Sequence, residues 1–179
     1  MCIKIRRAGP EDAERISSIG QTSFRNAFSG IFEANNLEDY LATVFHPSRI
    51  LAAIKRENNL FLLAEINGRS AGFAKIKKFS LHEEIDSGAQ MQLEKIYVLP
   101  DYQRQGVGNA LLHEAISLAC KMTPDYLWLD VYAGNVSAIQ FYKSNGFGIG
   151  ASYHKGYGSQ VFPYHLMLLP IEVNEPLCC

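Results

Sequence analysis

The stretch of residues 91–112, MQLEKIYVLPDYQRQGVGNALL, constrains the fold of this chain more than any other segment. Residues 91–99 alternate in two series that both contain apolar side chains, which predicts a strand covered on both faces. Pro100 ends this strand, and Gly106 and Gly108 then mark the start of a helical pattern of apolar residues. The sequence therefore predicts a buried strand, a glycine-containing turn and a helix in direct succession.

A turn that opens a helix is suited to binding phosphate. The first amide groups of the helix have no intrahelical acceptor, and the helix dipole adds positive potential. Gly106 and Gly108 let the backbone approach a ligand where a Cβ would intrude, although such glycines also occur for packing alone. Two familiar phosphate motifs fit less well. A Rossmann fingerprint needs a third glycine where Leu111 stands, and the Gly-Lys-Ser/Thr of a P-loop is absent.

Composition places a few further limits. A length of 179 residues predicts one domain, which we place at residues 1–170 with a tail at 171–179. The formal net charge of −1 gives no overall attraction to nucleic acid or to an anionic membrane. Neither a membrane-spanning run nor a signal-peptide core is present, so we expect a cytoplasmic protein. Histidine and cysteine spacings predict neither a metal site nor a disulfide framework; the cysteines are Cys2, Cys120, Cys178 and Cys179.

The order of the predicted elements indicates an α/β fold built on a mixed sheet, not a regular βαβ repeat. Asn67-Gly68 is the strongest hairpin signal, and residues 126–132 form a later strand. Asn135 is then expected to cap a helix that ends at Asn145-Gly146. Two closing strands, at 147–153 and 163–169, are expected around a glycine-rich loop.

Two motifs resemble those of a known family. Q-x-x-G-x-G at residues 103–108, directly after the strand, resembles the acyl-CoA-binding motif of the GCN5-related N-acetyltransferase (GNAT) family. The later block, Asn135 followed by A-x-x-x-Y and then Gly146-Phe147, resembles a second motif of that family. The resemblance is specific over residues 93–147. Within the family, the segments TSFRNAF, NLEDYL and PYHLML look like bacterial PaiA-type polyamine acetyltransferases.

The resemblance implies a single-domain GNAT fold, with a mixed, mostly antiparallel sheet that is splayed at the cofactor site and has helices on both faces. It also implies direct transfer of acetyl from acetyl-CoA, the only cosubstrate, to a primary amine, with a polyamine such as spermidine as one candidate. Other readings stay open: a peptide or protein N-terminus or lysine as acceptor, or a non-catalytic module that binds acyl-CoA and regulates a partner. The resemblance implies no metal, nucleic-acid or membrane partner, and it leaves a homodimer open.

Carried over by position, the resemblance assigns Tyr142 as the acid that protonates the leaving thiolate. Glu94 is our candidate base, with a structural salt bridge or a solvated strand end as the alternative role and Asp130 as the second candidate. Asn135 and Tyr142 share one helix face with Ala138, although a cap and a core residue are their ordinary roles. The expected cofactor-binding residues are Ile96, Tyr97, Val98, Gln103, Arg104, Gln105, Gly106, Val107, Gly108, Asn109, Asn135, Ala138 and Tyr142.

Overall fold

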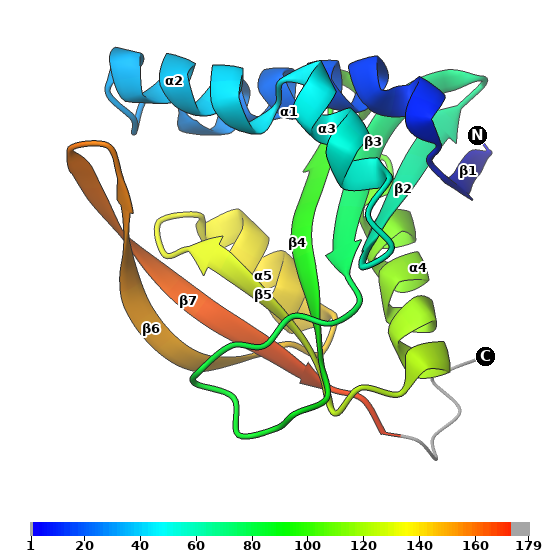
Figure 1. The fold of residues 1–179 in the computed structure, drawn as a ribbon, viewed down its shortest axis with the longest axis vertical. Helices are drawn as coiled ribbons and strands as arrows, with labels where there is room; N and C mark the ends of the chain where they lie inside the picture. The colour runs from blue at the N-terminus through cyan, green and yellow to red at the C-terminus, as the bar shows by residue number, and fades with distance from the viewer. Residues whose placement is uncertain (1, 173–179) are drawn as a thin grey trace. The chain divides into compact units, whose positions relative to one another are not determined.

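The computed structural model describes residues 2–172, which form two compact units. Unit 1 consists of the described residues up to Ile76 together with Lys95–Ala115, and unit 2 of Lys77–Glu94 and the described residues from Ile116 onward. The strands follow the order β1-β2-β3-β4-β5-β7-β6 in a seven-stranded sheet to which both units contribute (Figure 1). The elements are β1 Ile3–Arg7, η1 Pro10–Asp12, α1 Ala13–Phe28, α2 Ala34–Val44, α3 Pro47–Ile54, β2 Asn59–Ile66, β3 Arg69–Lys77, β4 Gln90–Val98, η2 Pro100–Tyr102, α4 Val107–Met122, β5 Tyr126–Tyr132, α5 Val136–Ser144, β6 Gly148–Tyr157 and β7 Gln160–Pro170.

The sheet is mixed and mostly antiparallel, which confirms the predicted fold class. β1 pairs antiparallel with β2, and β7 pairs antiparallel with both β5 and β6. The pairing of β4 with β5 is parallel. Its register runs from Gln90↔Tyr126 to Gln92↔Trp128, so Glu94 lies beyond the paired segment.

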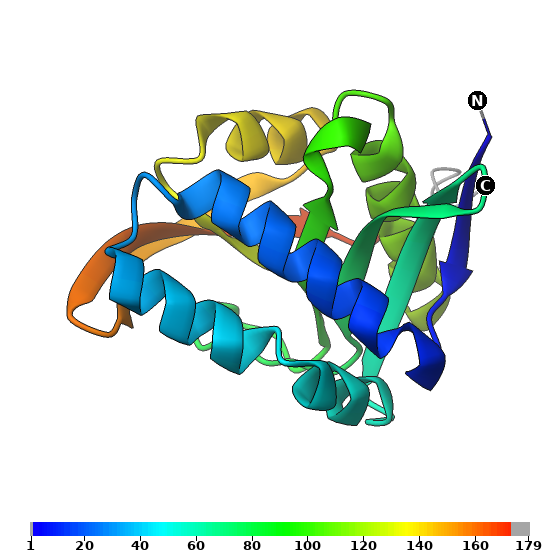
Figure 2. The ribbon, with the colours of Figure 1, turned by 90° about the horizontal axis from the view of Figure 1, so that it is seen from above.

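Unit 1 contains the predicted hairpin and an aromatic core. Asn67 and Gly68 both have positive φ angles, 50° and 76°, as a tight two-residue turn between β2 and β3 requires. Helices α1, α2 and α3 pack together (Figure 2), and Phe24 of α1 stacks on Tyr40 of α2 with 4.4 Å between ring centroids. The aromatic side chains of this segment are therefore mainly core. Helix α2 begins at Ala34, with Glu33 at its N-cap.

Unit 2 contains a closing hairpin that is longer than predicted. Residues 154–162, expected to form a loop, belong mostly to β6 and β7, which pair as far as Tyr157↔Gln160. Along β6 the side chains alternate between half-buried and exposed from Ala151 to Tyr157, as expected for a strand with one covered face.

The last described residues continue the fold of unit 2. Ile171 is buried, and its N–H donates a hydrogen bond to the carbonyl oxygen of Asp125 at 3.0 Å. Residues 173–179, which include the Cys178-Cys179 pair, lie outside the described residues.

Candidate functional site

The glycine-containing turn leads directly into the N-terminus of α4, as predicted. Residues 103–106 form an exposed turn in which Arg104 and Gly106 have φ angles of 58° and 84°. The first intrahelical bond runs from Ala110 N to Gly106 O at 3.0 Å. The amides of the three residues between them, Val107, Gly108 and Asn109, therefore have no acceptor within the helix and can donate to a ligand.

Two side chains of this turn tie it to the residues before it, one to the end of β4 and one to η2. The Nε2 of Gln103 donates a hydrogen bond to Val98 O at 3.2 Å. The Nε2 of Gln105 donates to Asp101 O at 2.7 Å. Both amide side chains thus hold the loop conformation, which is a structural reason for glutamine at these two positions.

The second half of β4 has one backbone edge fixed against β3. Leu99 N donates a hydrogen bond to Ala71 O at 2.9 Å, which directs the backbone groups of Leu99 towards β3. Because these groups alternate along a strand, those of Ile96 and Val98 face the opposite edge. Residues Lys95 to Leu99 are only half-buried, in contrast to the buried first part of β4.

Gly72 of β3 is a residue that the sequence analysis missed. A Cβ added there would lie 2.5 Å from Tyr97 O, so only glycine allows β3 to approach β4 this closely. A glycine inside a strand pattern was the available signal for such an approach.

In unit 2, Glu94 of β4 is engaged in an ion pair. Its Oε2 lies 3.0 Å from Nζ of Lys77, the last residue of β3, and 17% of the Glu94 side chain is exposed. The salt bridge considered as the alternative role of Glu94 is therefore present. A paired carboxylate can still accept a proton, so Glu94 as base stays a prediction.

Both carboxylate oxygens of Asp130, the second candidate base, are in contact with polar side chains of β6. Tyr153 of β6 donates its phenolic hydrogen to Oδ1, and Lys155 Nζ lies 2.5 Å from Oδ2. Burial, followed by the hydrogen bond to Asp130, raises the pKa of Tyr153, so this phenol stays neutral and keeps its proton at physiological pH. Neither partner was anticipated: Tyr153 is the last residue of the strand expected at 147–153, and Lys155 stands in the stretch expected to be a loop. The alternation A-x-Y-x-K-x-Y was the signal that could have placed both residues on one face of a longer strand.

Helix α5 carries the remaining predicted site residues. Asn135 is its N-cap, and its Oδ1 accepts a hydrogen bond from Ala138 N at 3.1 Å, so the predicted cap is confirmed. Tyr142 is buried against the rings of Phe141 and Phe147. Burial raises the pKa of its phenol, which therefore stays protonated at neutral pH.

The predicted site residues thus divide between the units. Unit 1 places the second half of β4 and the turn into α4 next to each other, while Glu94, Asp130, Asn135, Ala138 and Tyr142 belong to unit 2. Over the part of the chain that the structure describes, no group of three or more His, Cys, Asp or Glu side chains is placed to hold a metal ion. No helix within residues 2–172 is both long and apolar enough to cross a membrane.

Comparisons with known proteins agree with the fold. The spermidine N(1)-acetyltransferase of Thermoplasma acidophilum is 26% identical over 153 residues, which cover 83% of this chain and 90% of that protein. The ribosomal protein bS18-alanine N-acetyltransferase of Escherichia coli is 44% identical over 81 residues, 45% of this chain and 49% of that protein. In structure, the PaiA N-acetyltransferase from Thermoplasma acidophilum, crystallised in complex with coenzyme A, matches with a TM-score of 0.77 and 24% identity. This match covers 95% of this chain and 99% of that one.

The family itself is shown by a match to a large part of the sequence. The model of the Acetyltransferase (GNAT) family matches residues 22–147, which are well over half of the chain and include both motifs described above. With the mixed sheet and the turn at the start of α4, this match shows that the chain belongs to the GNAT family of acetyltransferases.

Proposed function

We propose that this protein transfers acetyl from acetyl-CoA to a primary amine, and that the acceptor is a polyamine such as spermidine. The observation that carries the first part is the turn at residues 103–106, which opens α4 within the family match. Its backbone suits the pyrophosphate of acetyl-CoA, because the amides of Val107, Gly108 and Asn109 have no acceptor within the helix.

The edge of β4 supports the same cofactor. The backbone groups of Ile96 and Val98 face away from β3, where they can pair with the amide groups of a pantetheine arm as a neighbouring strand would. Gln103 holds the pyrophosphate cradle next to this edge through Val98 O, and Gln105 links the turn to η2. Acetyl-CoA would then lie along β4 with its phosphates at the start of α4.

The reaction needs a neutral amine and a stabilised leaving group. An alkylammonium has a pKa of about 10.4, so one proton must leave before the nitrogen attacks the acetyl carbonyl carbon. We assign that proton to Glu94, directly or through water. As the C–N bond forms, the C–S bond breaks and CoA leaves as a thiolate.

Tyr142 is proposed as the group that donates to this thiolate. Its raised pKa keeps the hydrogen on the phenol, but it also makes Tyr142 a weaker acid than a free tyrosine. A thiol has a pKa near 8.5, so complete transfer from the phenol is uphill. Tyr142 therefore acts mainly by hydrogen bonding to the developing charge, and the proton taken from the amine can restore the thiol.

The choice of a polyamine rests on a relative that covers most of both chains, the spermidine N(1)-acetyltransferase of Thermoplasma acidophilum. A second candidate acceptor is a peptide N-terminus. It is favoured by the higher identity to the ribosomal protein bS18-alanine N-acetyltransferase, over a shorter stretch.

Release of CoA thiol, measured with acetyl-CoA and a panel of amines, tests these alternatives. The panel contains spermidine, spermine, an aminoglycoside and a peptide that begins with alanine. Fast turnover with the two polyamines supports the proposal, whereas turnover of the peptide alone replaces the polyamine with a peptide acceptor. Binding of acetyl-CoA without turnover of any amine would favour a regulatory module.

The cofactor site has its own test. Gly108→Asp places a side chain and a negative charge among the proposed phosphate-binding amides, so calorimetry should show weaker binding of acetyl-CoA. Gly88→Asp is the matched control, because an added Cβ there meets nothing within 4 Å and the residue lies in a loop of unit 2. Equal binding by both variants would argue against phosphate at this turn.

A further inference from the structure

An ammonium group of the chain itself occupies a site built for a cation in unit 2. Lys155 Nζ lies 2.5 Å from Asp130 Oδ2, 5.0 Å from the ring centroid of Tyr164 and 5.5 Å from that of Tyr153. One carboxylate and two aromatic faces therefore surround a single ammonium, which is the combination that proteins use to bind organic cations.

The sheet register explains why these groups meet. Tyr164 of β7 pairs directly with Tyr153 of β6, and Lys155 follows Tyr153 by two residues, so it stands on the same face. On the other side of β7, Tyr164 pairs with Tyr132 of β5, and Asp130 precedes Tyr132 by two residues. Three neighbouring strands thus contribute side chains to one face of the sheet, and this placement does not depend on a loop.

The carboxylate is held in place by groups other than Lys155. Tyr153 donates a hydrogen bond to Asp130 Oδ1, and His82 Nε2 lies 3.3 Å from the same phenolic oxygen. The His82 ring is itself fixed, because its Nδ1 accepts a hydrogen bond from Glu84 N at 3.2 Å. Since Nδ1 is an acceptor, the neutral ring carries its hydrogen on Nε2 and donates to Tyr153. The site therefore keeps its shape if the ammonium is exchanged.

We propose that Asp130, Tyr153 and Tyr164 bind an ammonium group of the amine acceptor, and that Lys155 fills this site as a tethered competitor until the acceptor arrives. This site is called the ammonium cage below. Its role in recognising an acceptor rests on the proposed acetyltransferase function. The assignment selects a di- or polyamine, because such an acceptor can place one cation in the cage while another nitrogen reacts. Because Asp130 then binds an ammonium group, Glu94 remains the candidate base.

Exchange at the cage is feasible because it replaces one ammonium with another. The Asp130 side chain is only 12% exposed, so removing Lys155 without a replacement would leave a largely buried carboxylate short of a counter-charge. A substrate ammonium restores the same contacts. The Lys155 side chain is 33% exposed, so its ammonium can regain water by rotation of its stem.

Calorimetric titration with spermidine in the absence of acetyl-CoA tests the cage. Lys155→Met keeps most of the stem and removes the competitor, so spermidine should bind about tenfold more tightly than to the unmodified chain. Adding Asp130→Asn to that variant should abolish the gain. Lys121→Met is the control for the loss of one positive charge, because Lys121 is an exposed residue of α4 in the same unit.

The location of bound spermidine is followed by NMR. In Lys155→Met, spermidine should shift the ring resonances of Tyr153 and Tyr164, which tests the cage even if the double variant does not fold. The proposal is overturned if Lys155→Met binds no more tightly than Lys121→Met, if the gain survives Asp130→Asn, or if the two rings do not respond. None of these measurements involves acetyl transfer. If the chain binds spermidine in the cage but acetylates no amine, the proposed function is disproved and the cage is retained. If it acetylates an amine but does not bind spermidine in the cage, only the cage is disproved.

Discussion

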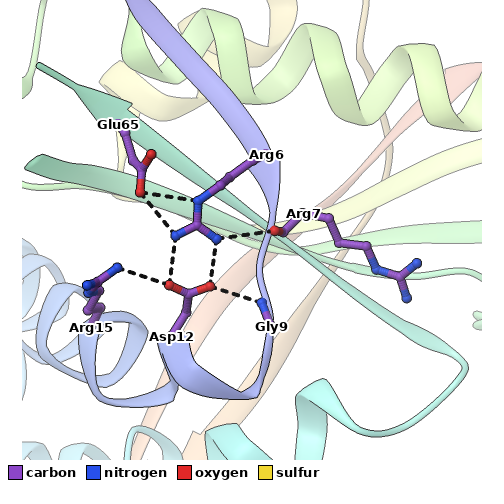
Figure 3. A network of polar contacts seen from close by, with 6 residues as sticks. All are labelled: Arg6, Arg7, Gly9, Asp12, Arg15 and Glu65. Atoms are coloured by element: carbon purple, nitrogen blue, oxygen red, sulfur yellow. Dashed lines mark hydrogen bonds and ion pairs between the residues drawn. The ribbon is translucent and has the colours of Figure 1, made fainter. Parts of the chain in front are cut away.

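Arg6 and Asp12 face each other in unit 1 with two parallel hydrogen bonds. Arg6 Nη1 donates to Asp12 Oδ2 at 2.7 Å, and Nη2 donates to Oδ1 at 2.8 Å (Figure 3). The Asp12 side chain is fully buried, and it also accepts hydrogen bonds from Gly9 N at 2.9 Å and from Arg15 at 3.3 Å. Arg6 donates in turn to Glu65 of β2 at 3.0 Å. This network joins β1 and β2 to the residue that immediately precedes α1.

Asp12→Asn should destabilise the fold strongly. The amide keeps the shape of the carboxylate, but it removes the charge that compensates Arg6 and cannot accept on both atoms. Removing the charge of only one partner of a buried, hydrogen-bonded ion pair should lower the free energy of unfolding by about 3 kcal/mol. Urea denaturation measures this change. Glu38→Gln serves as the control, because Glu38 pairs with Arg25 on the surface and little or no change is expected. Similar losses in both variants would contradict the assigned importance of the buried pair.

The Asp12 carboxylate also predicts that the free energy of unfolding decreases at acidic pH. Hydrogen bonds from Arg6 lower the pKa of Asp12 below its ordinary value near 3.9. A group whose pKa is lower in the folded state than in the unfolded state binds fewer protons when folded. Its contribution is therefore complete above the unfolded pKa and is lost as pH falls through the folded one. The urea midpoint, measured from pH 7 to pH 3, should decrease once the pH drops below about 4. This decrease should be less steep in Asp12→Asn. Parallel profiles would assign the decrease to other carboxylates.

Local signals were sufficient to predict several parts of this fold. The hairpin at Asn67-Gly68 follows from the positive φ angles that both residues adopt there. The cap at Asn135 and the left-handed Gly146 after α5, with φ of 90°, are likewise determined within a few residues. The turn before α4 belongs to the same class, because strand, glycine and helix are adjacent in sequence.

Contacts between distant residues could not be predicted in this way. The pairing of Asp130 with Lys155 depends on the strand order β5-β7-β6, which no local pattern specifies. The connection before β4 is a similar case. Gln90, at 3% exposure, accepts a hydrogen bond from His82 N at 2.6 Å and donates to Ser87 O at 2.6 Å, so its side chain holds the polar connection before β4 in place. A glutamine at the start of a strand does not by itself predict this role.

Gly106→Ala should destabilise the turn through backbone conformation alone. The residue has a φ of 84°, and an added Cβ would meet only Ile3 Cδ1, at an ordinary contact distance of 3.6 Å. The cost should therefore be that of placing an L-residue in the left-handed region, about 1 kcal/mol by urea denaturation. Gly30→Ala is the matched control, since nothing lies within 4 Å of its added Cβ and no left-handed φ is involved. A loss in the control as large as that in Gly106→Ala would show that strain at this turn is not the cause.

Tyr142→Phe separates the chemical role of the phenol from its packing. The ring lies against Phe141 and Phe147, at centroid distances of 5.2 and 5.7 Å, and phenylalanine preserves both contacts. Only the hydroxyl is lost. If the phenol stabilises the leaving thiolate, kcat should fall by about 10²-fold, the lower end of the range for general acids, because the raised pKa limits Tyr142 to hydrogen bonding. The affinity for acetyl-CoA should change little.

The control for this variant is a change of the ring contact that spares the hydroxyl. Phe147→Leu loosens the packing around Tyr142, so it should lower the melting temperature while kcat with spermidine, or with whichever amine proves best, falls much less than in Tyr142→Phe. Full activity in Tyr142→Phe would remove the phenol from the mechanism. The leaving thiolate would then depend on solvent or on the proton released by the amine, and Tyr142 would remain as a core residue of unit 2.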